Sequence, residues 1–305
     1  MDLRQIRYFL AIAEHGGFTP AAASLHIAQP SLSHAVRALE RELGSELFLR
    51  HPKGVALTAA GEALLGPARR IVRDFEVAKD AVNDVLGLAG GRLAVVAVPW
   101  VAVNCLAALV GELRRQHPGV TCTITEADDD RELAGMVVDG TCELGFVFAP
   151  PGGSSFLERN SLAYHVLGFQ EYWLVQPPGT LDDPNPIALS ELQDVPWVVP
   201  PAGVTTRDAV ELMLGTFNVR VDEAVIVDTR EALLPLVLAG AGVTMLSREE
   251  ADVAAQRGAV IRPITPPLRR SYGVLHREGA LSPAAKLLCE LATARARRAT
   301  GAGAP

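Results

Sequence analysis

A very short connection between two predicted helices restricts the fold of this chain more than any other feature of its sequence. A helix is expected at 21–25, with Thr19 as its N-cap and Pro20 at its first position, where a missing N–H costs nothing. Only residues 26–28 separate it from a second predicted helix at 29–43. Two helices joined by three or four residues are typical of a helix-turn-helix, so the amino-terminal region is predicted to contain this motif.

A further helix is predicted in front of this motif. Asp2 and Gln5 have the spacing of a capping box, and apolar residues then recur at helical intervals as far as Ala13. Gly16 and Gly17 end the run. The region therefore contains three predicted helices.

The helix at 29–43 has one apolar and one polar side. Leu32, Val36, Leu39 and Leu43 form a stripe that is expected to pack on the two earlier helices. The other side carries amide, hydroxyl, imidazole and guanidinium groups, which pair with base edges and phosphates in a major groove. A polar face that merely meets solvent is the alternative. The residues predicted to contact DNA from this helix are Gln29, Pro30, Ser31, Ser33, His34 and Arg37.

A hairpin is predicted directly after the helix-turn-helix. Strand-like residues at 47–50 and 55–57 enclose residues 51–54, in which Pro and Gly stand where a type I turn prefers them. A hairpin in this position is the wing of a winged helix-turn-helix. Arg50 and Lys53 at its tip are expected to contact the sugar-phosphate backbone or a minor groove.

A long helix with a single apolar seam follows the hairpin. Thr58 caps this helix, which is expected to continue to about Leu86. A second copy of the same helix is the simplest partner for the seam, so a homodimer is predicted. Packing against the chain's own carboxyl-terminal half is the alternative, because a seam this short is not decisive. The seam residues alternate in steps of four and three, and they are Leu64, Ala68, Ile71, Phe75, Ala78, Val82 and Val85.

The charge pattern changes near residue 90. The net charge is −7, yet the first ninety residues carry ten Lys or Arg and ten Asp or Glu, so the acidic excess lies later. The uncharged run 93–111 has the length of a membrane span, but Pro99 divides it into a strand and an amphipathic helix. No membrane contact is expected, and the absence of an export signal pattern favours the cytoplasm. The four cysteines are scattered, which predicts buried free thiols and no metal site.

Strands and helices alternate after residue 90. This order predicts a parallel sheet built by right-handed crossovers. Short apolar or β-branched runs mark the strands, which are expected at 92–98, 120–126, 143–149, 171–176, 196–199, 219–227 and 242–246.

From Met1 to about Gly66 the chain resembles the DNA-binding region of the LysR-type transcriptional regulators. The matching runs include Leu3-Arg4-Gln5-Ile6-Arg7-Tyr8-Phe9, Gly17-Phe18-Thr19, Ala28-Gln29-Pro30-Ser31-Leu32-Ser33 and Leu57-Thr58-Ala59-Ala60-Gly61. One departure is His34, where the family often has arginine, so the contact expected there is either weaker or sensitive to pH near neutrality. The resemblance implies a sequence-specific regulator that binds double-stranded DNA as a homodimer, or as a homotetramer of paired dimers, and that contacts RNA polymerase.

The later residues resemble, more loosely, the two-lobed effector-binding domain of the same family, which is similar to periplasmic binding proteins. Ser247 stands where the family often has proline. The resemblance implies an α/β multidomain chain with a two-lobed α/β domain of the periplasmic-binding-protein type. The implied parts are a winged helix-turn-helix at 1–58, a linker and dimerisation helix at 59–88, and an effector-binding domain at 92–300. Lobe 1 is expected at about 92–164 and 266–300, and lobe 2 at about 165–265.

A small-molecule effector site is expected in that domain. Open α/β sheets bind ligands beyond the carboxyl ends of their strands and between lobes, and helix N-termini there favour an anion such as a carboxylate. The alternative is that single residues have only a structural role, Trp100 as an aromatic side chain of a loop and Thr205 as a helix cap. The loops that meet the condition contribute Pro99, Trp100, Val101, Asp128, Phe148, Ala149, Ala202, Val204, Thr205, Thr206, Asp228 and Thr229.

No catalytic motif is complete in the sequence. Gly240-Ala241-Gly242 begins a dinucleotide fingerprint, but Met245 replaces its third glycine and a helix precedes it. The acidic run 128–130 stands at a predicted helix start, where carboxylates are favoured electrostatically. We therefore expect no enzyme and no cofactor. A solute-binding protein whose amino-terminal helices serve only for assembly is the alternative to a regulator.

Overall fold

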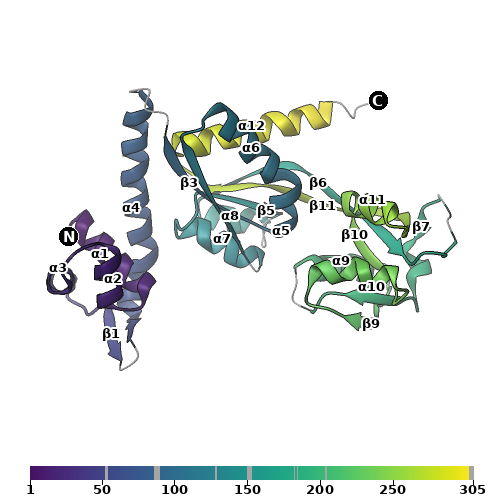
Figure 1. The fold of residues 1–305 in the computed structure, drawn as a ribbon, viewed down its shortest axis with the longest axis horizontal. Coiled ribbons are helices and arrows are strands. Elements are labelled where there is room, and N and C mark those ends of the chain that lie inside the picture. The colour runs from purple at the N-terminus through teal and green to yellow at the C-terminus, as the bar shows by residue number, and fades with distance from the viewer. Residues whose placement is uncertain are drawn as a thin grey trace.

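Three parts follow one another along the long axis of the molecule (Figure 1). The amino-terminal helices lie with the long helix α4 at one end, one lobe of an α/β region lies in the middle, and the second lobe lies at the other end. The computed structural model describes residues 1–51, 54–85, 90–127, 129–149, 153–181, 183, 185–202 and 205–301.

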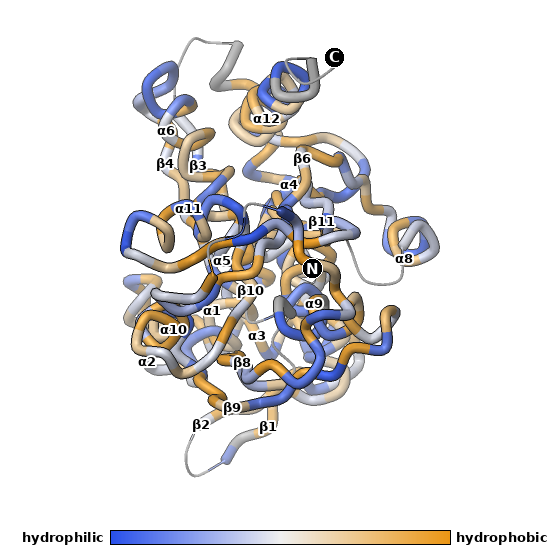
Figure 2. The backbone as a smooth tube through the Cα atoms, turned by 90° about the vertical axis from the view of Figure 1, so that its right-hand side faces the viewer, coloured by the Kyte–Doolittle hydropathy of each residue, from blue (hydrophilic) through white to orange (hydrophobic). Residues whose placement is uncertain are grey.

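The amino-terminal part is a winged helix-turn-helix. Its helices are α1 (Leu3–His15), α2 (Phe18–Ser24) and α3 (Gln29–Leu43), and its wing strands are β1 (Phe48–His51) and β2 (Gly54–Leu57). The wing strands pair antiparallel and project below the rest of the molecule in both views (Figure 1 and Figure 2). The predicted capping box of α1 is confirmed, as are both ends of α3.

The predicted start of α2 is wrong. The helix begins at Phe18, with Gly17 as its N-cap, whereas Pro20 was the predicted first residue. The first N–H groups of a helix have no partner within the helix, so Pro20 is tolerated as its third residue as readily as at its first. Thr19 therefore lies inside the helix and does not cap it.

Helix α4 (Ala59–Val85) begins and runs as expected. The Thr58 hydroxyl accepts a hydrogen bond from the Gly61 N–H at 3.0 Å, and the helix continues through Pro67. Ala68 is fully buried in the core of the helix-turn-helix. Farther along the seam, Ile71, Phe75 and Val82 are 40%, 51% and 60% exposed, although the Arg7 guanidinium of α1 lies over the Phe75 ring. Much of this part of the seam is therefore open to a partner.

The α/β region is organised around two long strands that run between the lobes, β6 (Leu162–Gln176) and β11 (Val260–Arg277). The main sheet has the order β10-β6-β11-β5-β3-β4, and β7 pairs with β11 beside it. The remaining strands are β3 (Gly91–Ala97), β4 (Val120–Glu126), β5 (Leu144–Phe148), β7 (Ile187–Ala188), β8 (Pro196–Val199), β9 (Asp222–Ile226) and β10 (Thr244–Ser247). The helices are α5 (Pro99–Val101), α6 (Ala107–Gln116), α7 (Asp130–Val138), α8 (Gly153–Arg159), α9 (Thr205–Gly215), α10 (Leu233–Leu238), α11 (Arg248–Gln256) and α12 (Pro283–Gly301).

The expectation of a parallel sheet is wrong for the strands that join the lobes. β3 pairs parallel with β4 and β5, and β8 pairs parallel with β9. β6 and β11 pair antiparallel with each other, as do β10 with β6 and β11 with β5. The chain passes once from lobe 1 to lobe 2 in β6 and returns in β11, so these two neighbours must run in opposite directions.

Each lobe has a hydrophobic core of its own. Lobe 1 buries residues of β3, β5, α6, α7 and α12 in one cluster, and lobe 2 buries residues of β6, β8 and β10 in two. The run 93–111 forms β3, α5, a turn of π-helix at Ala102–Leu106 and part of α6, as the strand and helix interpretation predicts. In the described part of the chain, no helix combines the length and the apolarity that a bilayer crossing requires.

Candidate DNA-binding face and effector site

The outer side of α3 is an open polar surface. Gln29, Pro30, Ser31, His34 and Arg37 are exposed, while Leu32, Val36 and Leu39 are fully buried beneath them. No described side chain caps the start of α3. Pro30 has no N–H and the Ser31 N–H donates to the Ala28 carbonyl at 3.0 Å, so the Gln29 N–H is the backbone donor that this end offers a phosphate oxygen. The surface therefore combines side-chain donors and acceptors with the positive end of a helix.

Ser33 was predicted to contact DNA from the outer side of α3, but the structure places it on the inner side. It is 8% exposed, because it lies about one turn before Val36 on the side of the helix that packs inward. The groove on the outer side is formed farther along, by His34, Arg37 and Arg41 together with residues 44–46. Ser33 therefore does not share the open surface with Gln29 and His34.

The wing is attached to the turn between α1 and α2. The Val55 N–H donates to the carbonyl of Gly16 at 3.0 Å, and a Cβ at Gly54 would lie 2.8 Å from the same oxygen. Gly54 also has a φ of 141°, so both its conformation and its surroundings require glycine. The predicted contact residue Lys53 lies outside the described residues, as does the side chain of Arg50.

The lobe 1 side of the expected effector site is built from aromatic rings. β3 and β5 are parallel, so the loops after them, with Pro99, Trp100 and Val101 and with Phe148 and Ala149, lie together. The Trp100 ring stacks on Phe148 with centroids 5.9 Å apart. It also meets Tyr272 of β11 edge to face at 5.3 Å, an aromatic partner that the sequence did not indicate.

The predicted residues of lobe 1 differ in what they offer a ligand. Pro99 and Ala149 are exposed, whereas Val101 is fully buried in the lobe 1 core and can offer only its backbone. Asp128 lies outside the described residues. Figure 1 shows the α5 end of lobe 1 on the side that faces lobe 2.

The lobe 2 side lies at the carboxyl ends of β8 and β9. These strands are parallel, and the Val227 N–H donates to the Val199 carbonyl at 2.9 Å, so the loops after both strands lie together. Ala202, Asp228 and Thr229 are exposed in these loops. Thr205 and Thr206 occupy the first turn of α9, but their side chains lie outside the described residues, as does Val204.

Sequence reasoning missed an ion pair at this site. Asp130, the first residue of α7, pairs with Arg270 of β11 at 2.7 Å, and the Arg270 guanidinium lies 4.0 Å from the Phe148 ring centroid. Burial raises the pKa of the Asp130 carboxyl, and the charge of Arg270 opposes that shift. The acidic run 128–130 was the available signal. Asp129 caps α7 as its position suggested, but nothing local indicated the partner of Asp130.

The cysteines have the character of core residues. Cys105 and Cys142 are buried, Cys122 and Cys289 are half-buried, and all four thiols are free. Burial raises the pKa of Cys105 and Cys142 to about 11 and that of Cys289 to about 12. These thiols therefore carry little nucleophilic thiolate at neutral pH. Within the residues that the structure describes, no group of three or more His, Cys, Asp or Glu side chains could hold a metal ion.

A winged helix-turn-helix, a long helix with an exposed apolar seam and a two-lobed α/β domain occur here in one chain. This combination defines a DNA-binding transcriptional regulator with an effector-binding domain. Comparisons with known proteins agree with this class. Residues 3–62 match the bacterial regulatory helix-turn-helix protein model of the lysR family, and residues 86–297 match the LysR substrate binding domain.

Relatives of known class resemble the chain along most of its length. The HTH-type transcriptional regulator ClcR of Pseudomonas putida is 31% identical over 257 residues, which cover 83% of this chain and 85% of ClcR. The RuBisCO operon transcriptional regulator of Allochromatium vinosum is 28% identical, with 98% of this chain and 97% of the relative covered.

Solved structures show the same fold. Full-length CbnR in complex with its target DNA is 25% identical, with a TM-score of 0.56 and coverage of 97% of this chain and all of that one. A full-length OxyR variant from Pseudomonas aeruginosa is 22% identical, with a TM-score of 0.72 and coverage of 96% of this chain and 98% of that one.

The chain belongs to the LysR family of transcriptional regulators. The alternative of a solute-binding protein with no DNA-binding role does not fit a chain whose first helices match the DNA-binding model of that family.

Proposed function

We propose that the outer face of α3 and the tip of the wing read an operator in the DNA upstream of the chain's own gene. The observation that carries this proposal is the division of α3 into a buried apolar stripe and an exposed row of Gln29, Ser31, His34 and Arg37. Amide, hydroxyl and guanidinium groups at the start of such a helix reach base edges, while wing cations contact phosphates. We include Arg50 and Lys53 among the wing cations.

An electrophoretic mobility shift with the full chain tests this proposal. Its own upstream DNA is expected to be retarded at concentrations that leave a scrambled fragment of the same composition free. Equal retardation of both fragments, or of neither, would overturn the proposal.

We propose that the effector is a small carboxylate with an apolar body, and that it binds between the lobes. The aromatic cluster of Trp100, Phe148 and Tyr272 supplies apolar surface, and Arg270 supplies a half-buried guanidinium beside it. Thermal unfolding of the full chain with small carboxylates, each compared with its neutral amide, tests the class of ligand. Stabilisation by an acid but not by its amide is expected, and a panel in which amides stabilise equally would contradict it.

We propose that the exposed seam of α4 pairs two copies of the chain, and that two such dimers form a tetramer. Ile71, Phe75 and Val82 supply the apolar surface that a second copy would cover. Phe75→Glu places a charge in this seam and is expected to lower the mass measured by light scattering to that of a smaller species. Leu181→Glu, at an exposed lobe 2 position, is the matched control. Unchanged assembly in Phe75→Glu would contradict the seam.

We propose that the chain acts in the cytoplasm, that its output is a contact with RNA polymerase, and that it catalyses no reaction. Support comes from the family, whose named relatives here are transcriptional regulators. Transcription in vitro from the upstream promoter, with purified polymerase, tests the output. A transcript level that does not respond to the full chain would count against it.

A further inference from the structure

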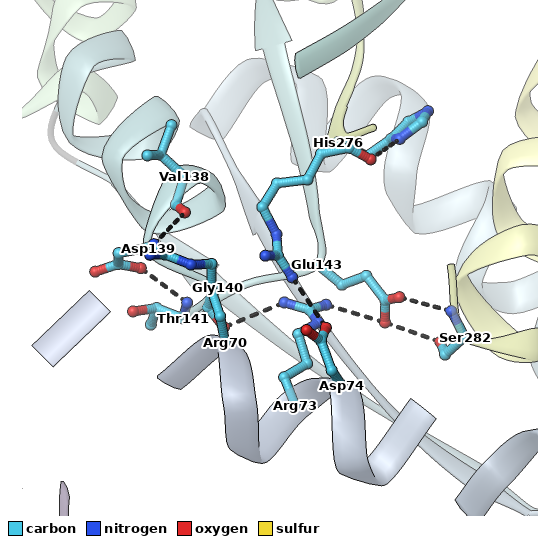
Figure 3. Close-up of polar contacts among 11 residues, drawn as sticks. Arg70, Arg73, Asp74, Val138, Asp139, Gly140, Thr141, Glu143, His276 and Ser282 are labelled. Carbon is cyan, nitrogen blue, oxygen red and sulfur yellow. Dashed lines mark hydrogen bonds and ion pairs between the residues drawn. The ribbon is translucent and has the colours of Figure 1, made fainter. Parts of the chain in front are cut away.

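Helix α7 has one end at the effector site and the other at the linker helix. At its start, Asp130 pairs with Arg270 of β11 at 2.7 Å. Beyond its last turn, Asp139 pairs with Arg69 of α4 at 2.6 Å. The Gly140 carbonyl accepts from Arg73 at 3.1 Å (Figure 3). One short helix therefore contacts both the lobe-joining strand and the helix that carries the DNA-binding part.

The contact at the start of α7 is incompletely satisfied. Oδ2 of Asp130 accepts from Nη2 of Arg270, but Oδ1 of Asp130 and Nη1 of Arg270 are buried without a hydrogen-bond partner. Buried polar groups normally have partners, so these two atoms favour any arrangement that supplies one. A ligand that does so, or a shift of β11, changes the position of Asp130.

Arg270 stands where β11 passes between the lobes. Leu268, two residues before it, is buried in the lobe 2 core, whereas Val274 is buried in the lobe 1 core. A rotation of one lobe relative to the other is therefore expected to displace Arg270, because the strand on either side of it is held in a different core.

The contact at the other end of α7 is held on lobe 1 by a buried carboxylate. Arg73 also pairs with Glu143 at 3.1 Å, and Glu143 is 7% exposed. Both oxygens of Glu143 accept hydrogen bonds from Ser282, from its N–H at 2.7 Å and from its hydroxyl at 2.8 Å (Figure 3). Arg70 adds a longer contact of 3.5 Å to the Val138 carbonyl. The free carbonyls and partial negative charge at a helix C-terminus favour such cations.

The body of α7 connects these ends as a unit. Leu133, Ala134 and Val137 are buried in the lobe 1 core, against β5 and β11. Its nine residues span about 13 Å at the usual helical rise. A close-packed helix shifts as a whole more readily than it deforms.

We infer that α7 transmits the state of the effector site to α4, with Asp130 and Arg270 as the input contact and Arg69, Arg73 and Glu143 as the output contact. The inference rests on the proposed function of the space between the lobes. It assigns Asp130 and Arg73 as positioning residues, because neither is required to touch DNA. A change at Asp130 therefore alters the placement of α4, and with it the placement of α3 on an operator.

A double-mutant cycle on the full chain tests this coupling without any ligand. Asp130→Asn is combined with Arg73→Gln, and affinity for the chain's own upstream DNA is measured by fluorescence anisotropy. The fold-change in Kd caused by Asp130→Asn is measured twice, once with Arg73 intact and once in the chain that already carries Arg73→Gln. We expect these two fold-changes to differ by a factor of about 2 to 30. Asp183→Asn, which breaks the lobe 2 ion pair with Arg262, is the matched control and is expected to act alike in both backgrounds.

Hydrogen exchange provides a second readout that does not depend on DNA. Asp130→Asn is expected to alter the exchange of α4 amides near Arg73, and this effect is expected to vanish when Arg73→Gln is already present. Equal factors in the cycle together with unchanged α4 exchange would overturn the coupling. A wild-type chain that binds no upstream DNA would defeat the proposed function, while the exchange result would still decide the inference.

Folding of the variants is checked by tryptophan fluorescence, since the three tryptophans lie at 100, 173 and 197. Should Asp130→Asn fail to fold, Arg270→Lys replaces it, because it keeps the cation but loses the forked geometry.

Discussion

The amino-terminal helices and the two lobes differ in how far apart their contacting residues lie along the chain. In the helix-turn-helix, the core joins Ile6, Phe9, Leu32 and Leu39, all within the first forty residues. In the α/β region, Asp130 meets Arg270 across 140 positions, and Glu143 meets Ser282 across 139. The first part is assembled by neighbours in sequence, and the second by chain crossings.

This difference determines which functional surface is visible from sequence. On α3 the functional face is what remains after the apolar stripe has packed, so it follows from the helical period. The proposed effector site follows from the passage of β6 and β11 between the lobes, which places Arg270 and Tyr272 beside Trp100 and Phe148. The two parts should therefore respond separately to changes in salt, packing and pH.

A change in salt concentration should affect the DNA-binding part and the lobes most differently. The chain is acidic overall, so the proposed function makes DNA affinity depend on a few cations near α3, namely Arg37, Arg41, Arg50 and Lys53 in each copy. Raising KCl from 50 to 200 mM is expected to weaken operator binding by about 10³-fold or more, because each neutralised phosphate releases counterions. The tryptophan-detected unfolding of the lobes should change little over the same range. An operator affinity independent of salt would contradict this account of the DNA-binding face.

Core truncation should have the next largest effect. Leu39→Ala removes a fully buried side chain from the helix-turn-helix and is expected to cost about 3 kcal/mol of stability there. All three tryptophans lie in the lobes, so far-UV circular dichroism should show an earlier urea transition while tryptophan fluorescence does not. Leu288→Ala in the lobe 1 core is the matched control, with the opposite pattern expected. A joint shift of both signals in Leu39→Ala would show that the two parts unfold together.

The pH dependence should be the smallest effect and should belong to the lobes. Nε2 of His165 on β6 lies 3.2 Å from Nε2 of His276 on β11, and burial together with that second imidazole lowers the pKa of His165. As the pH falls, the His165 imidazole is protonated near pH 6.5 in the unfolded chain but only at a lower pH in the folded chain. The free energy of unfolding should therefore decrease as the pH drops below about 6.5. His165→Asn should reduce the loss of Tm between pH 7.5 and pH 5.5. His15→Asn in α1 is the control, and an unchanged pH dependence in His165→Asn would refute the assignment.

The sequence predicted the order of parts, the limits of α3, the capping box of α1 and most strand positions, because these depend on local periodicity and capping. It did not predict β11 or residues 162–170 of β6 as strands. Their antiparallel pairing was missed with them, since a strand that joins two lobes has no local signature of its direction. The prediction also placed Ser33 on the wrong side of α3, because it relied on the hydrogen-bonding capacity of the hydroxyl and not on the angular position of the residue around the helix. The pairs Asp130–Arg270 and Arg73–Glu143, each with a buried carboxylate, were missed, because each joins elements far apart in sequence.

The central claim is that the outer face of α3 reads base edges. Selection of binding sites from a randomised DNA pool, carried out with the wild-type chain and with Gln29→Ala, tests it most directly. The wild type should enrich a two-fold symmetric site whose half-sites lie about 10 base pairs apart or a multiple of that distance. Gln29→Ala should lose its preference at one base pair in each half-site, at a cost of about 1–3 kcal/mol, and keep the rest. Identical preferences in both proteins, or no enriched sequence for the wild type, would contradict the account.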